Sequence, residues 1–341
     1  MSTSSSQPPP LPANSPGTRE DLAIVTRELR RAFNGTLAVD GVDLAVEHGE
    51  IYGFLGPNGA GKTTCVRMLC TLLRPSSGSA SVAGFDVARE AAELRLRIGV
   101  AMQEAALDDR QTGSEFQRLQ ARLYGLRGAE VERRGRDMAV MLELGEALDR
   151  PIGTYSGGMK RRLDVAAALI HNPEVVFLDE PTTGLDPISR VKVWEEVRRV
   201  NSELGTTIFL TTQYLEEADS MADRVGIIDQ GRLVAEGTPT ELKRRIGSDV
   251  IVIAVGSDGN EERAREAVGS VAGVERVDFC DGELTLSVAE GATAVTPVAA
   301  ALDRNDVEVR HLTLRTPTLD DVFLNATGAR LREDDTREED S

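Results

Sequence analysis

The stretch IYGFLGPNGAGKTT, residues 51–64 of the 341-residue chain, decides the fold. Residues 51–55 are apolar and typical of a buried strand, and residues 65–69 can continue as a helix. Between them, residues 56–64 satisfy G-x-x-x-x-G-K-S/T in full, in the strand–loop–helix context that a phosphate-binding loop requires. The alternative is a glycine-rich turn that happens to contain a lysine, which the full spacing and both flanks disfavour. The stretch therefore predicts that the chain binds a nucleoside triphosphate.

The residue types of this loop suit phosphate chemistry. Glycines let the backbone curl so that consecutive N–H groups point inward, and the helix N-terminus adds partial positive charge. Lys62 can reach the β- and γ-phosphates, and the Thr63 hydroxyl can ligate Mg²⁺. The expected ATP-binding residues of the loop are Gly56, Pro57, Asn58, Gly59, Ala60, Gly61, Lys62, Thr63 and Thr64.

A second apolar strand predicts the other half of a phosphate site. Residues 175–178 are apolar, and Asp179 and Glu180 follow them directly. Open α/β sheets place ligands at the carboxyl ends of their strands. There Asp179 can hold Mg²⁺, and Glu180 can orient and deprotonate an attacking water. Many strands end in solvated carboxylates, so this pattern indicates a phosphate site only because a phosphate loop occurs in the same chain.

A serine followed by two glycines, Ser156, Gly157 and Gly158, opens another predicted helix. A hydroxyl and glycines at a helix N-terminus form a second anion-binding device. The alternative is an ordinary N-cap, in which Ser156 caps the helix and the glycines give flexibility. One ATP site hardly needs two such devices, whereas two facing copies of the chain would use both.

Composition limits the possible partners. The formal net charge of −17 leaves no basic excess for nucleic-acid phosphates. The three cysteines, Cys65, Cys70 and Cys280, form no CxxC pair and are expected to be buried small hydrophobes in a reducing compartment. No apolar run is long enough to span a membrane, and no secretory signal is visible. We expect a soluble, cytosolic chain that docks on a partner.

The order of apolar runs predicts two folded domains between polar ends. Residues 1–20, rich in Ser and Pro, are expected to be a disordered leader, and residues 329–341 a charged tail. Residues 21–247 alternate strands and helices as an α/β ATPase domain, with a helical subdomain at about 104–165. Residues 248–328 follow the order βαββαβ, which predicts a small α+β, ferredoxin-like domain.

Other chemistry-bearing residues have ordinary explanations. His48, His171 and His311 lack metal-ligand spacing. Asp108-Asp109 and Glu195-Glu196 are expected on solvated faces, and Trp194 and Val197 in an apolar helix stripe that belongs to the core. Phe33 follows a predicted strand, and the sequence leaves a core role and a ligand-stacking role equally open.

The ordered motifs together resemble the ATP-binding subunits of ABC transporters over about residues 22–247. Residues 56–64 match Walker A, Gln103 the Q-loop, residues 155–159 the signature motif, residues 175–179 Walker B with Glu180 as the adjacent base, and Gly184-Leu185-Asp186 the D-loop. By this resemblance Phe33 takes the position of the aromatic residue that stacks on adenine, and Gln103 joins Thr63 and Asp179 at the metal.

Two departures from the usual motifs narrow the resemblance to one type of ABC transporter. Tyr155 and Met159 replace the usual ends of the signature Leu-Ser-Gly-Gly-Gln, and Gln213 replaces the switch histidine. Together with the stretch PTLDDVFL at residues 317–324, they are similar to the daunorubicin/doxorubicin-resistance type of drug exporter, in which a small C-terminal domain is expected. Gln213 can still hydrogen-bond a γ-phosphate but carries no charge, so we expect no histidine ionisation in the pH profile.

The resemblance implies a P-loop NTPase with an ABC ATPase core that hydrolyses Mg·ATP, with catalytic roles for Lys62, Gln103, Glu180 and Gln213. It implies a homodimer that closes around two ATP molecules, each loop covered by Ser156, Gly157, Gly158 and Asp186 of the other copy. It also implies a separate ABC-2-type membrane permease, docked around Gln103 and the helical subdomain on the cytoplasmic face, that exports a hydrophobic drug or related compound.

Two alternatives stay open at this point. A soluble ABC ATPase acting on ribosomes or DNA usually carries two cassettes or a long coiled-coil insert, and this chain shows one cassette without sustained heptads. A nucleotide-dependent regulatory module that barely turns over ATP is compatible with Gln213. The cargo and the direction of transport rest on the resemblance alone.

Overall fold

The computed structural model describes residues 22–103, 107–141, 143–255, 261–280 and 283–327. The expected leader and charged tail lie outside these residues. The chain divides into two compact units. One contains the described residues up to Tyr52, Gly59–Thr211 and Gln230–Arg232; the other contains Gly53–Asn58, Thr212–Asp229 and the described residues from Leu233 onward.

An antiparallel sheet of the first unit has the strand order β2-β1-β4-β5. Its strands are β1 (Leu22–Phe33), β2 (Thr36–Glu47), β4 (Ser77–Val82) and β5 (Phe85–Asp86). A turn at Asn34-Gly35 joins β1 to β2, and both residues have left-handed backbones, with φ of 48° and 87°. Such residues are favoured in tight hairpin turns because their twist matches that of the strands.

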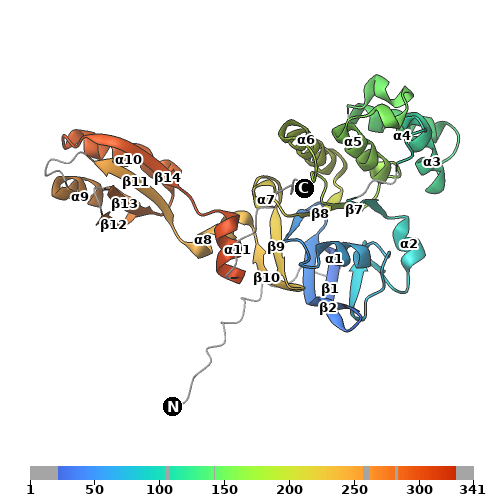
Figure 1. Cartoon of the computed structure of the whole chain (residues 1–341), viewed down its shortest axis with the longest axis horizontal. Helices are drawn as coiled ribbons and strands as arrows, with labels where there is room; N and C mark the ends of the chain where they lie inside the picture. The colour runs from blue at the N-terminus through green and yellow to red at the C-terminus, as the bar shows by residue number, and fades with distance from the viewer. Residues whose placement is uncertain (1–21, 104–106, 142, 256–260, 281–282, 328–341) are drawn as a thin grey trace, which may run out of the picture. The chain divides into compact units, whose positions relative to one another are not determined.

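A six-stranded sheet, in the order β10-β9-β3-β8-β7-β6, carries the phosphate loop and the acidic pair (Figure 1). Its strands are β10 (Arg232–Gly237), β9 (Arg224–Asp229), β3 (Ile51–Leu55), β8 (Thr207–Thr212), β7 (Val175–Asp179) and β6 (Ile98–Ala101). Strands β6, β7 and β8 pair in parallel, and every residue of β3, β7 and β8 is buried. Continuous burial explains why β3 and residues 175–178 of β7 show no alternation of apolar and polar residues, whereas β8 also buries three threonines.

Aromatic packing ties neighbouring strands of this sheet together. The ring of Phe209 on β8 lies 5.5 Å from that of Tyr52 on β3 and 5.7 Å from that of Phe177 on β7, measured between centroids. Such pairs contribute about 0.5–1.5 kcal/mol each beyond their burial. They fix the strands whose carboxyl ends bear the candidate site.

The helices of the first unit begin and end at recognisable signals. They are α1 (Lys62–Leu69), α2 (Ala91–Arg95), α3 (Gly113–Leu123), α4 (Ala129–Met141), α5 (Gly157–Leu169) and α6 (Pro187–Leu204), with short 3-10 turns at Gly145–Asp149 and Ile152–Thr154. For example, α6 starts with an Asp186 cap and Pro187 and ends at Gly205, whose φ is 64°. Asp at the N-cap, Pro in the first turn and Gly past the end are the expected choices.

The helical insert predicted before the signature is present as α3 and α4, which pack on each other and on α5 (Figure 1). A capping box between Thr112 and Glu115 starts α3. Phe116 is buried, but Leu119 and Leu123, of the same apolar stripe, are exposed. The helical pattern is confirmed, and part of its apolar face is left open to solvent.

The C-terminal part of the second unit confirms the ferredoxin-like expectation. Its elements are β11 (Asp249–Val255), α9 (Glu261–Gly269), β12 (Val274–Cys280), β13 (Glu283–Val288), α10 (Gly291–Arg304) and β14 (Val309–Arg315). The strand order is β12-β13-β11-β14, and each neighbouring pair is antiparallel. Apolar residues from β11 and β13 alternate inward and pack with α9 and α10.

Three further helices of this unit share one apolar cluster. They are α7 (Leu215–Met221), α8 (Pro239–Ile246) and α11 (Leu319–Thr327). Leu319, Val322 and Phe323 of α11 pack in a cluster that includes Leu215 and Leu55, the last residue before the phosphate loop. The apolar pattern did not predict α8, β10 or α11. The domain boundary at residue 247 stays a prediction.

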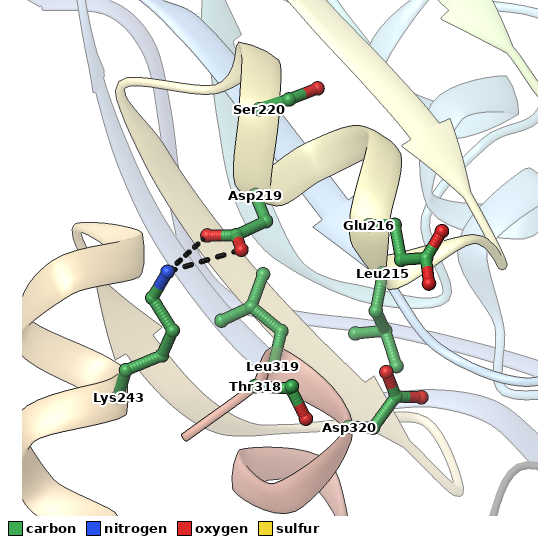
Figure 2. Close-up of a pocket in the computed structure, with 8 residues that line it drawn as sticks. All are labelled: Leu215, Glu216, Asp219, Ser220, Lys243, Thr318, Leu319 and Asp320. Atoms are coloured by element: carbon green, nitrogen blue, oxygen red, sulfur yellow. Dashed lines mark hydrogen bonds and ion pairs between the residues drawn. The ribbon is translucent and has the colours of Figure 1, made fainter. Parts of the chain in front are cut away.

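A pocket of about 250 Å³ opens among α7, α8 and the start of α11 (Figure 2). It is lined by Leu215, Glu216, Asp219, Ser220, Lys243, Thr318, Leu319 and Asp320. The Lys243 ammonium lies 2.7 and 3.1 Å from the two Asp219 carboxylate oxygens and joins α8 to α7. Partly exposed pairs of this kind contribute little stability, so the apolar cluster holds these helices together.

Candidate active site

The phosphate loop has the backbone that its glycines predict. Gly59 and Gly61 are left-handed, with φ of 82° and 110°, and Gly61 caps α1. The Gly61 carbonyl accepts the first helical hydrogen bond from the Cys65 amide at 2.9 Å. Residues other than glycine rarely adopt such conformations. Lys62 and Thr63 thereby occupy the first turn of α1, where the helix end attracts anions.

The loop residues meet the acidic pair. The Lys62 ammonium lies 3.2 Å from a Glu180 carboxylate oxygen, and both side chains are buried, at 4% and 7% exposure. The Thr63 hydroxyl donates to Asp179 Oδ1 at 3.2 Å, across 116 residues of sequence. The structure therefore brings together the residues expected to bind phosphate, hold the metal and activate water.

Asp179 and Thr63 fit a divalent cation. Asp179 is fully buried; its Oδ1 accepts from Thr63 and from Thr211 at 2.6 Å, while its Oδ2 has no hydrogen-bond partner in the part of the chain that the structure describes. A buried carboxylate oxygen is costly without a partner. Mg²⁺ takes oxygen ligands, often from one or two side chains plus substrate phosphates. No group of three or more His, Cys, Asp or Glu able to hold a metal occurs among the described residues.

Glu180 has an unusual backbone that its neighbours stabilise. Its φ is 47°, an uncommon conformation for a residue other than glycine that costs about 1–3 kcal/mol. Its amide donates to the Thr211 carbonyl at 3.2 Å and the Thr211 hydroxyl at 2.9 Å, and its carboxylate accepts from Thr183 at 3.2 Å. These contacts fix the carboxylate at the end of β7.

The signature residues form a second group, at the start of α5. Ser156 caps this helix, its hydroxyl accepting from the Met159 amide at 3.3 Å, so the N-cap interpretation is correct as local geometry. Ser156 and Gly157 are exposed. A Cβ at Gly158 would lie 3.0 Å from the Ser189 hydroxyl, so this glycine allows close packing on α6. Asp186, which caps α6, accepts from the Ser189 amide at 3.0 Å.

The remaining predicted site residues differ in exposure. Gln103 is exposed just after β6, and Gln213 is half-buried between β8 and α7. Phe33 is 43% exposed, and the Arg31 guanidinium lies 4.6 Å from its ring centroid. This exposure excludes the core role for Phe33 that the sequence left open. The ligand roles of these residues stay predictions.

Two buried residues that contact the acidic pair were not predicted. Thr211 lies opposite Asp179 in the parallel pairing of β7 with β8, so a hydroxyl residue at that strand end was an available signal. Arg161 on α5 donates to the backbone on both sides of Glu180. Nothing in the sequence distinguishes Arg161 from the adjacent Arg162.

The expectations for the other side chains are mostly confirmed. Cys65 and Cys70 are buried, and burial raises the pKa of their thiols to about 12 and about 11. The side chain of Cys280 lies outside those described. His171 stacks on Tyr124 with ring centroids 3.6 Å apart, and burial lowers its pKa to about 4. Trp194 and Val197 are buried as expected.

Glu196 is a correction, because it is 6% exposed rather than solvated. It lies 3.6 Å from the Arg162 guanidinium, between α6 and α5. Burial raises the pKa of its carboxyl to about 7, against the opposing attraction of Arg162. Helix periodicity placed Glu196 beside the core residue Val197, and a charged residue at the edge of an apolar stripe gave no signal of burial.

We therefore expect Glu196→Gln to stabilise the protein more at high pH. Between about pH 4.5 and 7 the folded state holds a proton that the unfolded chain has lost, so the free energy of unfolding falls as pH rises through this window. Glutamine mimics the protonated acid. The melting temperature of the variant relative to the unmodified chain should rise between about pH 5 and pH 8. Glu195→Gln, at the exposed neighbour, is the control; an equal offset at both pH values would contradict the prediction.

Comparisons with known proteins agree with this geometry. The family model described as "ABC transporter" matches residues 39–183, and the model of the "ATP-binding protein DrrA1-3-like, C-terminal domain" matches residues 237–327. The chain is 46% identical over 317 residues to the daunorubicin resistance ATP-binding protein DrrA2 of Streptomyces coeruleorubidus, covering 93% of this chain and 98% of that protein. It is 45% identical to the daunorubicin/doxorubicin resistance ATP-binding protein DrrA of Streptomyces peucetius, covering 91% of this chain and 94% of that protein.

Solved structures show the same fold. The structure of cbiO1 from Clostridium perfringens, part of the ABC transporter complex cbiONQ, has a TM-score of 0.61 at 28% identity, covering 65% of this chain and 90% of that chain. A dimeric bacterial ABC transporter cassette has a TM-score of 0.58 at 24% identity, covering 63% and 98% of the two chains. The second likeness concerns the fold alone.

A phosphate loop faces an Asp–Glu pair at the end of a strand with parallel neighbours, and a Ser-Gly-Gly sequence starts the helix that follows a helical insert. This combination defines an ATP-binding cassette that hydrolyses ATP. The chain belongs to the ATP-binding proteins of ABC transporters, of the daunorubicin/doxorubicin-resistance type. The expectations for fold class, ATPase activity and family are confirmed. The relatives do not favour the alternatives of a ribosome- or DNA-directed ATPase or a regulatory module.

Proposed function

We propose that this chain powers the efflux of a hydrophobic drug or related compound through a separate ABC-2-type permease. The relatives support the cargo class, since their names attach them to daunorubicin and doxorubicin resistance. The meeting of Lys62 and Thr63 with Asp179 and Glu180 carries the ATPase part of the proposal. The chain would work at the cytoplasmic face of the membrane, as a peripheral subunit.

The site residues divide the chemistry among them. Lys62 binds the oxygens of the terminal phosphates, and the glycine-rich backbone donates N–H groups to them. Asp179 and Thr63 would hold Mg²⁺, which when bound neutralises charge on the β- and γ-phosphates. Glu180 orients the attacking water and accepts its proton. Thr211 holds both acids in place through its hydroxyl.

A homodimer would complete each site. Ser156 and Gly157 are exposed at a helix N-terminus, where backbone N–H groups favour an anion, and Asp186 caps the adjacent helix. We propose that each copy presents this surface to the ATP held by the other copy. Closure around two ATP molecules would then precede hydrolysis, and hydrolysis would reopen the pair.

Mixing two inactive variants tests the shared site. Ser156→Ala and Lys62→Ala chains should each hydrolyse ATP poorly, while an equimolar mixture should recover activity, because a mixed dimer holds one intact composite site. Steady-state phosphate release measures the recovery. The control is a mixture of two separate preparations of Lys62→Ala, which can form no intact site. A mixture as inactive as either variant would contradict the dimer model.

The permease is expected to dock on the helical subdomain. Exposed apolar side chains occur there at Leu119 and Leu123 of α3 and at Val140 of α4, and Gln103 is exposed nearby in sequence. No helix in the described ranges has the length and apolarity to cross a bilayer. Exposed apolar groups of this kind mark interaction surfaces when they gather in patches.

Co-purification tests the transport proposal. The full chain would be co-expressed with a candidate permease, purified with it and reconstituted in lipid vesicles with daunorubicin as the probe. We expect daunorubicin to raise the ATPase rate and to move across the vesicle membrane, with Glu180→Gln as the inactive control. ATP hydrolysis that no permease and no drug alters would favour the soluble alternative, and hydrolysis that stays near zero would favour the regulatory one.

A further inference from the structure

Arg161 forms a buried polar centre that the mechanism above does not use. It lies on α5, five positions after Ser156, and is 7% exposed. Its guanidinium donates to three backbone carbonyls outside its own helix: Nε to Pro181 at 3.0 Å, Nη1 to Met102 at 2.6 Å and Nη2 to Asp179 at 3.1 Å. A planar guanidinium can serve three acceptors in fixed directions, whereas a lysine ammonium cannot reproduce that fork.

Two of these carbonyls belong to the residues on either side of Glu180. The guanidinium therefore bridges the Asp179 and Pro181 carbonyls, with the left-handed residue Glu180 between them. Thr211 also restrains Glu180, because its hydroxyl accepts from the Glu180 amide at 2.9 Å. A left-handed conformation at a residue other than glycine persists only when its surroundings over-determine it. The bridge supplies such a restraint at the residue that bears the catalytic acid.

The third carbonyl belongs to Met102, at the end of β6. Met102 directly precedes Gln103, where the described chain leaves the sheet toward the helical insert. One side chain thus connects the start of the Gln103 loop, the flanks of Glu180 and the helix that Ser156 begins. A shift of any one of these three segments therefore changes the hydrogen bonds of the same Arg161 side chain that contacts the other two.

The charge of Arg161 is compensated locally. Asp164, one turn further along α5, lies 3.1 Å from Nη1. Burial raises the pKa of the Asp164 carboxyl to about 6, partly offset by Arg161, and burial lowers the pKa of Arg161. Burying an ion pair carries a desolvation cost that its contacts must offset. The hydrogen bonds of the guanidinium to the three carbonyls, together with Asp164, supply those contacts.

We propose that Arg161 is a positioning residue that sets the backbone of Glu180 for water activation and couples it to the Gln103 loop and the signature helix. The inference rests on the proposed role of Glu180. Loss of the guanidinium should leave the phosphate loop intact and misplace the acid. Misplacement by about 1 Å can cost about a hundredfold in rate.

Arg161→Gln in the full chain should lower kcat for ATP hydrolysis by about ten- to a hundredfold, with the dissociation constant for ATP changed less than about threefold. The kcat of Arg161→Lys should lie between that of the unmodified chain and that of Arg161→Gln. This variant tests the proposal if Arg161→Gln does not fold. The matched control is Arg134→Gln, since Arg134 also donates to two carbonyls of α5, those of Ile170 at 3.0 Å and Leu169 at 3.1 Å, at the far end of the helix. It should lower the melting temperature and keep kcat.

A double-variant cycle separates positioning from general damage. In the Glu180→Gln background, adding Arg161→Gln should change the residual single-turnover rate less than about threefold, because the two residues act through one group. A further loss of about ten- to a hundredfold in the double variant would overturn this inference but not the proposed function. The same holds if Arg134→Gln loses as much kcat as Arg161→Gln. Near-normal hydrolysis by Glu180→Gln itself would overturn the proposed function together with this inference.

Discussion

Glu180→Gln is expected to lower kcat for ATP hydrolysis by about a hundred- to ten-thousand-fold while ATP still binds. The carboxylate is buried at the end of β7, beside the Lys62 ammonium that would bind the terminal phosphate. Glutamine keeps the size of the side chain and can accept from Thr183, but it cannot take a proton from water. Single-turnover hydrolysis and equilibrium binding of ATP, measured on the same preparation, separate the two effects.

The control for this variant lies at the other end of the same strand. Glu174→Gln removes a carboxylate just before β7, where Glu174 pairs with Arg97 at 2.9 Å and is partly exposed. A surface pair of this kind is worth about 1 kcal/mol or less, so both stability and kcat should stay nearly unchanged. Equal loss of activity in the two variants would mean that strand β7 is sensitive as a whole, and hydrolysis by Glu180→Gln near the unmodified rate would remove Glu180 from its role.

The parts of the site that the sequence predicts are those with local physical causes. The loop at residues 56–64 needs glycine backbones and a helix start, and both requirements are written in adjacent residues. Strand β7 is buried on both faces, so its apolar run and the acids after it are also visible in one short stretch. The ferredoxin-like order of β11 to β14 follows from periodicity in the same way.

The parts that the sequence did not predict depend on contacts between distant segments. Thr211 reaches Asp179 because β8 pairs with β7 in one register; the hydroxyl residue at the end of β8 is visible in the sequence, but the register is not. Arg161 differs from Arg162 only in which side of α5 faces the carbonyl ends of β6 and β7. Glu196 is buried because Arg162 and the neighbouring helix cover it. Tertiary packing decides which of these side chains are buried and what they contact. Helix periodicity reduces the number of candidate positions but does not identify the one that is used.

The same dependence on contacts between distant segments explains why the sequence did not predict α11. Its nine residues, Leu319–Thr327, are short for a helix and would be marginal in isolation. Packing of Leu319, Val322 and Phe323 against residues such as Leu215 and Val225 stabilises it. In the sequence, residues 317–324 are informative only as a feature of the family, because the three buried residues of α11 pack on partners about a hundred positions away.

Lys62→Ala is expected to weaken ATP binding by about ten- to a hundredfold, because a charge-assisted hydrogen bond to the phosphates is lost. Lys160→Ala is the control, since Lys160 is a partly exposed lysine of α5 that pairs with the exposed Asp109 at 2.7 Å. Equilibrium titration with ATP in the presence of Mg²⁺ measures both. Unchanged affinity in Lys62→Ala would contradict the assignment of the phosphate loop.

The ligand-free chain provides a second, independent consequence of the same change. Lys62 and Glu180 are both buried, so Lys62→Ala leaves the Glu180 carboxylate without this cation. Removal of one partner from a buried pair costs about 3–5 kcal/mol, more than the loss of the pair as a whole. The double variant Lys62→Ala with Glu180→Gln should therefore unfold at a higher urea concentration than Lys62→Ala alone, although neither binds ATP well. If the double variant is the less stable of the two, the buried pair does not exist in solution in the arrangement that the structure shows, and the affinity loss of Lys62→Ala must be attributed to a damaged loop instead of a missing charge.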